Sequence, residues 1–259
     1  LQERPDTPVL AMVSRLVSHK GLDLVCETLD SFMDKDVQFV VLGKGDAKYE
    51  TFFEYARQRY GGRMAVYLGY SEELAMQIYA GADLFLMPSK SEPCGLSQMI
   101  AMRYGAVPIV RETGGLKDTV HAYEAWNGQG NGFTFANYNA GDMCHVICEA
   151  IDLYHNNRGA YETLQRRGMT ADFSWTRSAQ EYRRIYESIC RKRKGKRSMT
   201  IDSVKKMKDA LCEKLKVSFG STVEEASDAQ MMRASALVLR DVMAERSVDT
   251  MRETREEHR

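Results

Sequence analysis

The chain has 259 residues, of which 44% are hydrophobic and 28% are charged, and its 36 basic residues balance its 36 acidic residues. This composition excludes a collagen-like, low-complexity or wholly disordered chain, and the length allows one large domain or two unequal ones. A dedicated nucleic-acid-binding protein would carry a basic excess, and a membrane span needs a longer apolar run than any found here. We therefore expect partners that are neither nucleic acid nor membrane.

In chain order, strand-forming and helix-forming segments alternate over the first half of the sequence. Apolar runs typical of buried strands occupy residues 9–13, 37–42, 65–68, 84–87, 107–110 and 132–135. Helical patterns cover residues 20–33, 47–60, a segment ending near 78, 95–104 and most of 140–189. The alternation predicts an α/β fold with a Rossmann-like, doubly wound parallel sheet. Because the strands are apolar on both faces, we expect helices on both sides of the sheet.

The last part of the sequence differs from the rest. Residues 191–259 carry 17 basic and 12 acidic residues, and the basic excess lies almost wholly in Arg191-Lys-Arg-Lys-Gly-Lys-Arg197. We interpret this run as a solvated linker rather than as a patch for an anionic surface. Residues 198–259 have helical patterns and no strand. We therefore predict a domain over residues 5–190, a basic linker over 191–197 and an all-helical C-terminal extension over 198–259.

The six cysteines contain no CxxC pair. Cys144 and Cys148 flank His145 within one helical turn, which would suit a metal, but the apolar residues around them favour packed thiols. Cysteines scattered through apolar segments are typical of a reducing compartment. We therefore expect a protein of the cytoplasm or of a similarly reducing space.

Ligands of an open parallel sheet bind beyond the carboxyl ends of its strands, so the residues that follow each strand are candidates for function. Cations, glycines, an aromatic ring and one carboxylate gather there. These residues are Arg15, Lys20, Tyr70, Glu92, Cys94, Gly95, Leu96, Thr113, Gly114 and Gly115. The cations would neutralise a diphosphate, and the paired glycines at a helix start would offer free N–H groups to it. The pattern favours a nucleotide diphosphate site.

Each of these features alone has a plainer interpretation. Arg15 and Lys20 are compatible with surface charges, and Cys94 with a small buried apolar residue. Asp34-Lys-Asp36 has the spacing of a metal-binding DxD motif, but it precedes the second strand and so lies at the opposite edge of the sheet. We expect that segment to be a solvated loop. The convergence of several loops on one edge is what favours the nucleotide site.

Several segments resemble the C-terminal domain of bacterial glycogen synthases and plant starch synthases. They are Ser14-Arg-Leu with Lys20-Gly-Leu-Asp-Leu, Ser91-Glu-Pro-Cys-Gly-Leu-Ser-Gln98, Thr113-Gly-Gly-Leu-Lys-Asp-Thr119 and Asp172-Phe-Ser-Trp175. The resemblance covers about residues 5–190. It implies a GT-B fold and a retaining glucosyltransferase that extends an α-1,4-glucan from ADP-glucose, with no metal or other cofactor. It also implies a bacterial cytoplasm, or a plastid if the source is a plant or alga.

The resemblance implies a role for each residue at the edge. Arg15 and Lys20 would bind the diphosphate, Glu92 the donor glucose, and Tyr70 would lie near the adenine. The remaining residues would line the pocket for glucose and phosphate or contact the phosphates. The lining residues are Cys94, Gly95 and Leu96, and the phosphate contacts are Thr113, Gly114 and Gly115.

The sequence departs from the family in two respects. Ile100 stands where many related transferases carry a second glutamate, so a ribose contact through that position is absent. The family's N-terminal domain, which supplies most acceptor contacts, is not represented, so we expect this chain to hold only the donor half of the cleft.

The C-terminal extension has a resemblance of its own. Lys214-Leu-Lys, Thr222-Val-Glu-Glu-Ala-Ser227 and Leu239-Arg-Asp-Val-Met-Ala-Glu-Arg246 resemble the N-terminal helices of glycogen or starch phosphorylases. This implies a synthase–phosphorylase fusion, and an ordinary helical extension is the alternative.

Three other functions compete with an ADP-glucose-dependent synthase. A second retaining GT-B transferase using UDP-glucose would share every motif above. A dinucleotide-binding oxidoreductase needs GxGxxG after the first strand, which Ser14-Arg15-Leu16 lacks. A non-catalytic scaffold module of glucan metabolism would have no need for Arg15, Lys20 and Glu92 together.

Overall fold

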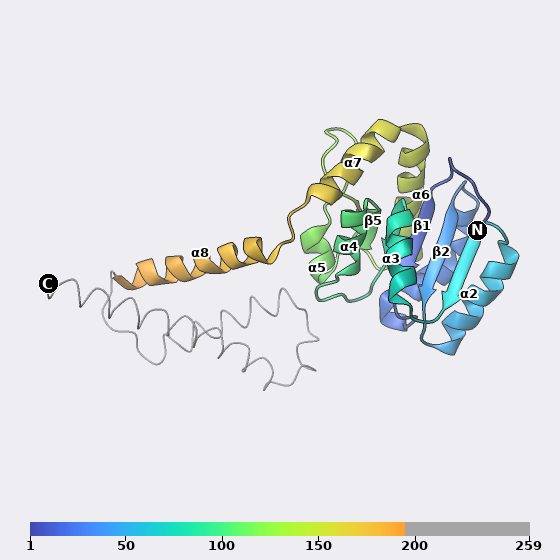
Figure 1. Ribbon diagram of the computed structural model, residues 1–259, viewed down its shortest axis with the longest axis horizontal. Helices are drawn as coiled ribbons and strands as arrows, with labels where there is room; N and C mark the ends of the chain where they lie inside the picture. The colour runs from blue at the N-terminus through green and yellow to red at the C-terminus, as the bar shows by residue number, and fades with distance from the viewer. Residues whose placement is uncertain (195–259) are drawn as a thin grey trace. The chain divides into compact units, whose positions relative to one another are not determined.

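The computed structural model describes the backbone of residues 1–194 and the side chains of residues 1–189 (Figure 1). Six parallel strands form one sheet in the order β3-β2-β1-β4-β5-β6. The strands are β1 (Val9–Val13), β2 (Gln38–Gly43), β3 (Met64–Leu68), β4 (Leu84–Met87), β5 (Val107–Arg111) and β6 (Phe133–Phe135). Each lies within a residue or two of its predicted position, and the predicted doubly wound parallel sheet is confirmed.

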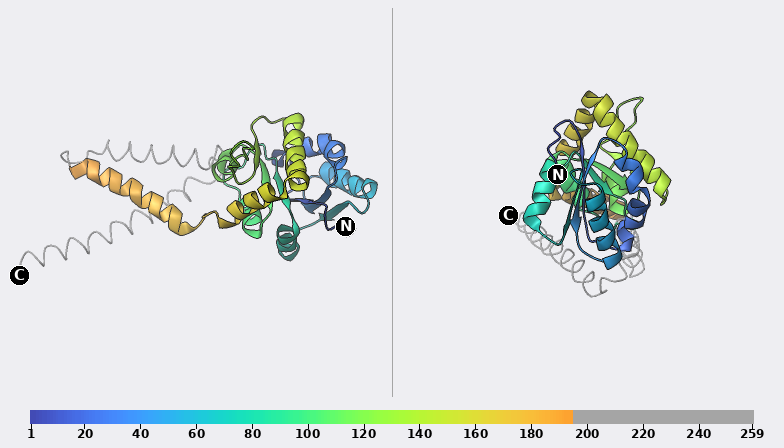
Figure 2. Two further views of the ribbon diagram at one scale, coloured as in Figure 1. Left: turned by 90° about the horizontal axis from the view of Figure 1, so that it is seen from above. Right: turned by 90° about the vertical axis from the view of Figure 1, so that its right-hand side faces the viewer.

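Helices cover both faces of this sheet (Figures 1 and 2). The helices are η1 (Ser18–Lys20), α1 (Leu22–Met33), α2 (Ala47–Arg59), α3 (Glu72–Gly81), α4 (Ser97–Tyr104), α5 (Gly114–Thr119), α6 (Ala140–Asn156), α7 (Arg158–Thr170) and α8 (Trp175–Lys194). Strand residues alternate between two cores, as the pleat requires. Leu10 and Met12 of β1 pack with α1, α2 and α6, whereas Ala11 between them packs with α3, α4 and α5.

The strand order creates a single reversal point at the centre of the sheet. From β1 the chain proceeds outward to β2 and β3, then returns to place β4 on the other side of β1. Leu10 and Ala11 of β1 pair with Leu84 and Phe85 of β4. The connections that leave β1 and β4 therefore diverge and open a crevice at the carboxyl ends of these two strands.

Two local features differ from the prediction. Helix α4 begins at Ser97 rather than at Gly95, because Gly95 has a φ of +72°, which is incompatible with a right-handed helix. The sheet is also not covered everywhere, since Tyr67 and Leu68 at the end of edge strand β3 are exposed.

The structure describes only part of the C-terminal region for which the sequence makes predictions. Helix α8 continues to Lys194, so the first four residues of the predicted basic linker are helical. The rest of that linker and the helical segment predicted over residues 198–259 lie outside the described residues. None of the helices within residues 1–194 is long and apolar enough to cross a membrane.

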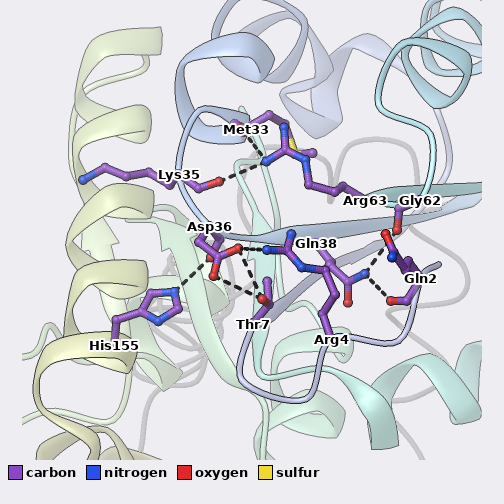
Figure 3. A network of polar contacts seen from close by, with 10 residues as sticks. All are labelled: Gln2, Arg4, Thr7, Met33, Lys35, Asp36, Gln38, Gly62, Arg63 and His155. Carbon is purple, nitrogen blue, oxygen red and sulfur yellow. Dashed lines mark hydrogen bonds and ion pairs between the residues drawn. The ribbon is translucent and has the colours of Figure 1, made fainter.

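The Asp34–Asp36 segment is exposed, as expected, but it is not merely solvated. The Asp36 carboxylate accepts hydrogen bonds from Arg4 at 2.6 Å and from Thr7 at 3.2 Å, and the Asp36 carbonyl oxygen lies 2.9 Å from Nε2 of His155 (Figure 3). These partners come from the N-terminal segment and from α6. The loop therefore joins distant segments at the edge of the sheet opposite the β1–β4 crevice.

Candidate functional site

A cavity of about 220 Å³ lies at the carboxyl ends of β1 and β4, where the crevice opens. Apolar residues of the two strands form its floor, and polar residues of the following loops form its rim. The lining residues are Met12, Val13, Ser14, Arg15, Lys20, Leu86, Met87, Ser89 and Ser97. Two of the predicted site residues, Arg15 and Lys20, thus line one cavity at the point where such sheets bind ligands.

An ion pair joins two predicted residues that are 72 positions apart in the sequence. The Lys20 ammonium lies 2.5 Å from Oε2 of Glu92, and the Ser89 hydroxyl donates to the same oxygen at 3.2 Å. The two charged side chains are only 17% and 12% exposed. The attraction between them is therefore weakly screened by solvent.

Gly21 explains how Lys20 reaches this position. Its φ is +75°, and a Cβ at this position would lie 2.1 Å from the carbonyl oxygen of Pro88. Only glycine allows the chain to turn this close to the end of β4. The Lys90 N–H donates to the His19 carbonyl at 2.9 Å and holds η1 against the same loop.

The charges at the cavity rim favour an anionic ligand. Arg15 is exposed, and it makes no ion pair within the part of the chain that the structure describes. His19, in the same segment of chain, has a pKa below its ordinary value, first because of partial burial and then because Lys20 and Arg15 repel its protonated form. His19 was not predicted as a site residue. In the sequence, its position between the predicted site residues Arg15 and Lys20 could have indicated it.

The paired glycines at the start of α5 allow close packing against the loop after β4, and the N–H of one of them is already bonded. A Cβ on Gly115 would lie 2.0 Å from the Cys94 carbonyl oxygen, and one on Gly114 would lie 2.2 Å from the Glu92 carbonyl oxygen. The Gly115 N–H donates to the carbonyl oxygens of Glu92 and Pro93 at 3.3 and 3.1 Å. The prediction of a free N–H at Gly115 is therefore wrong.

The other predicted residues do not line the cavity itself. Cys94 and Leu96 are exposed in the loop between β4 and α4, and Thr113 precedes the first residue of α5. Tyr70 follows β3, two strands away from β1, and is 86% exposed. It does not line the cavity, so the fold alone does not bring it to Lys20 and Glu92.

Arg111 is a residue of the site that the sequence analysis missed. It ends β5, and its guanidinium donates from Nε to the Ser89 carbonyl at 3.0 Å and from Nη2 to the Lys90 carbonyl at 2.6 Å. It thereby fixes the peptide that carries the Ser89 hydroxyl toward Glu92. Its signal was a single charge at the end of an otherwise apolar strand.

The Cys144–Cys148 pair does not form a comparable site. Both thiols are half-buried on α6, and burial raises the pKa of Cys144 to about 11, which keeps it a neutral thiol. Within the described residues there is no group of three or more His, Cys, Asp or Glu side chains that could hold a metal ion.

A doubly wound parallel sheet with a cationic cavity at its reversal point defines an open α/β domain with its cavity where such sheets bind their ligands. The family described as glycosyl transferases group 1 matches residues 1–167, and the chain belongs to this family.

Comparison with individual proteins narrows the resemblance. Glycogen synthase from Bacillus cereus strain B4264 is 53% identical over 189 residues, which cover 73% of this chain and 40% of that protein. Glycogen synthase from Desulfitobacterium hafniense is 53% identical over 184 residues, which cover 71% of this chain and 39% of that protein. The chain thus spans about two fifths of the length of the curated relatives it matches.

A solved structure extends the similarity to the fold. The catalytic domain of starch synthase IV from Arabidopsis thaliana, bound to ADP and acarbose, matches with a TM-score of 0.65 and 34% identity over 71% of this chain and 39% of that chain. The fold is therefore GT-B-like, and the resemblance to glycogen and starch synthases is confirmed. The phosphorylase-like character of residues 201–259 stays a prediction.

Proposed function

We propose that residues 5–190 are the donor-binding half of a glucan synthase. In this proposal they bind ADP-glucose and, together with an N-terminal acceptor-binding domain, transfer glucose with retention to the non-reducing end of an α-1,4-glucan. The observation that carries the proposal is the cavity at the β1–β4 reversal point, which Arg15 and Lys20 line and where Lys20 pairs with Glu92. The Bacillus relative is a glycogen synthase, and the Arabidopsis structure contains ADP and acarbose, which supports this substrate class.

The charged residues suit the two parts of such a donor. Arg15 and Lys20 would stabilise the negative charge that develops on the diphosphate as it leaves. Glu92 would accept hydrogen bonds from glucose hydroxyls, with Ser89 holding its orientation. Because an ammonium group has three donors, Lys20 would keep Glu92 as a partner while it binds a phosphate oxygen.

The remaining predicted residues receive supporting roles. Cys94, Gly95 and Leu96 would line the sugar pocket, and Thr113 and Gly114 would approach the phosphates. Gly115, whose N–H is already bonded, would act by packing. For Tyr70 to approach the adenine, the base would have to extend from the cavity toward the end of β3.

The proposal includes donor binding without a metal ion. The side chains themselves supply positive charge to the diphosphate through Arg15 and Lys20. Calorimetric titration of the 259-residue chain with ADP, ADP-glucose and UDP-glucose, each with and without EDTA, tests both points. We expect ADP-glucose to bind more tightly than UDP-glucose, with EDTA having no effect. Tighter binding of UDP-glucose would assign the alternative transferase, and loss of binding in EDTA would contradict the metal-free site.

Arg15→Ala provides the matched test of the site itself. Loss of a charged hydrogen bond to the diphosphate should weaken ADP binding roughly 10- to 100-fold, since such bonds contribute about 1.5–3 kcal/mol. Arg166→Ala on α7, which removes a cation with 79% side-chain exposure, is the control and should bind like the wild type. Equal binding by both variants would remove Arg15 from the site.

A further inference from the structure

Gln98 is a fully buried polar residue in the first turn of α4, beside the candidate sugar pocket. Its Nε2 lies 2.8 Å from the Gly95 carbonyl oxygen and 3.2 Å from that of Cys94. The same nitrogen lies 3.1 Å from Oγ1 of Thr119 at the end of α5. The two carbonyl partners require donors, so they fix which end of the carboxamide faces them.

Thr119 connects this carboxamide to the neighbouring loop. Its hydroxyl donates to the Gly115 carbonyl at 2.6 Å and accepts from Gln98. The Gly115 N–H in turn donates to the carbonyl oxygens of Glu92 and Pro93. The bonds therefore close a ring that runs from the loop after β4 through α4 and α5 and back to the same loop. Each of the two loops is held in place by the other.

The Gln98 carboxamide also lies close to the backbone of Gly95. A Cβ on Gly95 would lie 2.6 Å from Oε1 of Gln98, and the φ of Gly95 is +72°. The carboxamide thus packs directly against the backbone that begins the Gly95–Leu96 turn. A different side chain at position 98 would leave this turn without its support.

The carboxamide oxygen of Gln98 takes no part in the ring of hydrogen bonds. Oε1 of Gln98 has no hydrogen-bond partner within the described residues, although it is fully buried. A buried polar atom without a partner destabilises the fold, so core packing alone does not explain a glutamine here. The advantage of glutamine at this position is the placement of the two loops.

We propose that Gln98 and Thr119 are positioning residues that set the geometry of the donor site. They would hold the Cys94–Leu96 turn, on the sugar side, in register with the Gly114–Gly115 turn, on the phosphate side. This inference rests on the proposed function for its ligand, a nucleoside diphosphate glucose. The ring of hydrogen bonds itself is independent of any ligand.

Two substitutions interrupt the ring of hydrogen bonds at different points. Gln98→Leu removes the carboxamide with little change in volume, and Thr119→Val removes the hydroxyl of a side chain of the same shape. Thr119→Ser keeps the hydroxyl and serves as the rescue variant. Thr28→Val is the control, because buried Thr28 on α1 donates to the Leu24 carbonyl in the same way but lies outside the site.

The first measurement is calorimetric binding of ADP and ADP-glucose to the 259-residue chain. Misplacement of hydrogen-bonding groups around the glucose weakens their bonds, so we expect Gln98→Leu and Thr119→Val to weaken ADP-glucose binding about 10- to 100-fold. The loss for ADP should be smaller, because ADP has no glucose to place against the Cys94–Leu96 turn. Thr119→Ser and Thr28→Val should bind both ligands within about twofold of the wild type.

The second measurement is amide hydrogen exchange without ligand, which separates the two proposals. Thr119→Val should accelerate exchange at Ile100, whose N–H donates to the Leu96 carbonyl at 2.9 Å, although the substitution lies in α5. Wild-type-like binding of ADP-glucose by Thr119→Val overturns the positioning role. If the wild-type chain binds neither ligand, the proposed function fails, and unchanged exchange in Thr119→Val contradicts the ring itself. Thr119→Val decides the question even if Gln98→Leu does not fold.

Discussion

The charged side chains at and beside the cavity combine one neutralised ion pair with one cation that is unpaired within the described residues. Lys20 and Glu92 neutralise each other at 2.5 Å with little exposure, and Ser89 supplies a further bond to the carboxylate. Arg15 adds a cation that this pair does not neutralise, so the net charge of these three ionised side chains is positive. An entering diphosphate therefore meets an attractive site without having to expel a buried carboxylate.

The Lys20–Glu92 pair makes a prediction for stability. Exposed ion pairs contribute about 0–1 kcal/mol, whereas breaking a fully buried pair costs about 3–5 kcal/mol. Lys20→Met leaves a mostly buried carboxylate without its cation, so we expect a loss of about 2 kcal/mol in the free energy of unfolding. The double variant Lys20→Met with Glu92→Gln should recover part of that loss. Urea unfolding of both variants measures this, and strictly additive losses would contradict the coupling.

His19 makes a prediction for pH. Burial and the cations Lys20 and Arg15 lower its pKa below 6.5, while Glu92 and Asp46 oppose them, so the free protein holds it neutral at pH 7. A diphosphate bound by Lys20 and Arg15, the cations that lower this pKa, would bring negative charge near the ring and raise the pKa. Binding then takes up a proton, so affinity for ADP-glucose should rise as the pH falls from 7 toward 5.5.

The matched variant for this effect is His19→Gln, which keeps a polar side chain but cannot titrate. Its affinity for ADP-glucose should change less over the same pH interval. ADP-glucose is the suitable ligand because its diphosphate has no terminal phosphate that titrates near neutral pH. A pH dependence that is identical in the two proteins would show that His19 does not sense the ligand.

At the scale of elements, the site depends on how closely two loops approach each other. Gly114 and Gly115 lie against the carbonyl oxygens of Glu92 and Cys94 at distances that no side chain would permit. The loop that carries Glu92 is thus packed between η1 on one side and α5 on the other. Its position comes from tertiary contacts and not from a local turn motif.

Substitution of two helical glycines tests this dependence. A Cβ on Gly115 would lie 2.0 Å from the Cys94 carbonyl, so Gly115→Ala must shift a loop and should cost about 2–3 kcal/mol as well as nucleotide affinity. A Cβ on Gly159 in α7 meets nothing within 4 Å, so Gly159→Ala should gain about 0.5–1 kcal/mol. Thermal unfolding compares the two, and equal effects would contradict a close-packed role for Gly115.

These elements also show what a sequence can and cannot specify. The apolar runs and helical periods located every strand of the sheet, because burial on both faces leaves a strong local signal. The same approach placed Lys20 and Glu92 at one edge through the rule for parallel sheets. It failed for Gly115, whose N–H partner lies in another loop, and it overlooked Arg111 and Gln98, since their hydrogen bonds are made across the fold.

At the scale of the whole molecule, we expect the described fold to provide one wall of a larger cleft. The cavity is lined by strands of a single sheet and by the segments that follow them, and the chain spans about two fifths of the length of its glycogen synthase relatives. Glycosyl transfer requires a donor and an acceptor held within reach of each other, and the acceptor must be bound by something that faces this edge. The relatives have additional chain outside the matched region that would supply it.

We therefore expect the 259-residue chain to bind ADP-glucose but not to transfer glucose by itself. Positioning of two reactants accounts for about 7–11 kcal/mol of a barrier, and a site that holds only the donor forgoes that contribution. The measurement is incorporation of labelled glucose into glycogen. Intact Bacillus cereus glycogen synthase is assayed in parallel as the active control, and the Glu92→Ala variant of the 259-residue chain is the inactive control. Addition of the N-terminal part of that synthase as a separate chain should raise incorporation only if it docks on this edge. Incorporation by the 259-residue chain alone at a rate near that of the intact enzyme would show that these residues bind the acceptor as well as the donor.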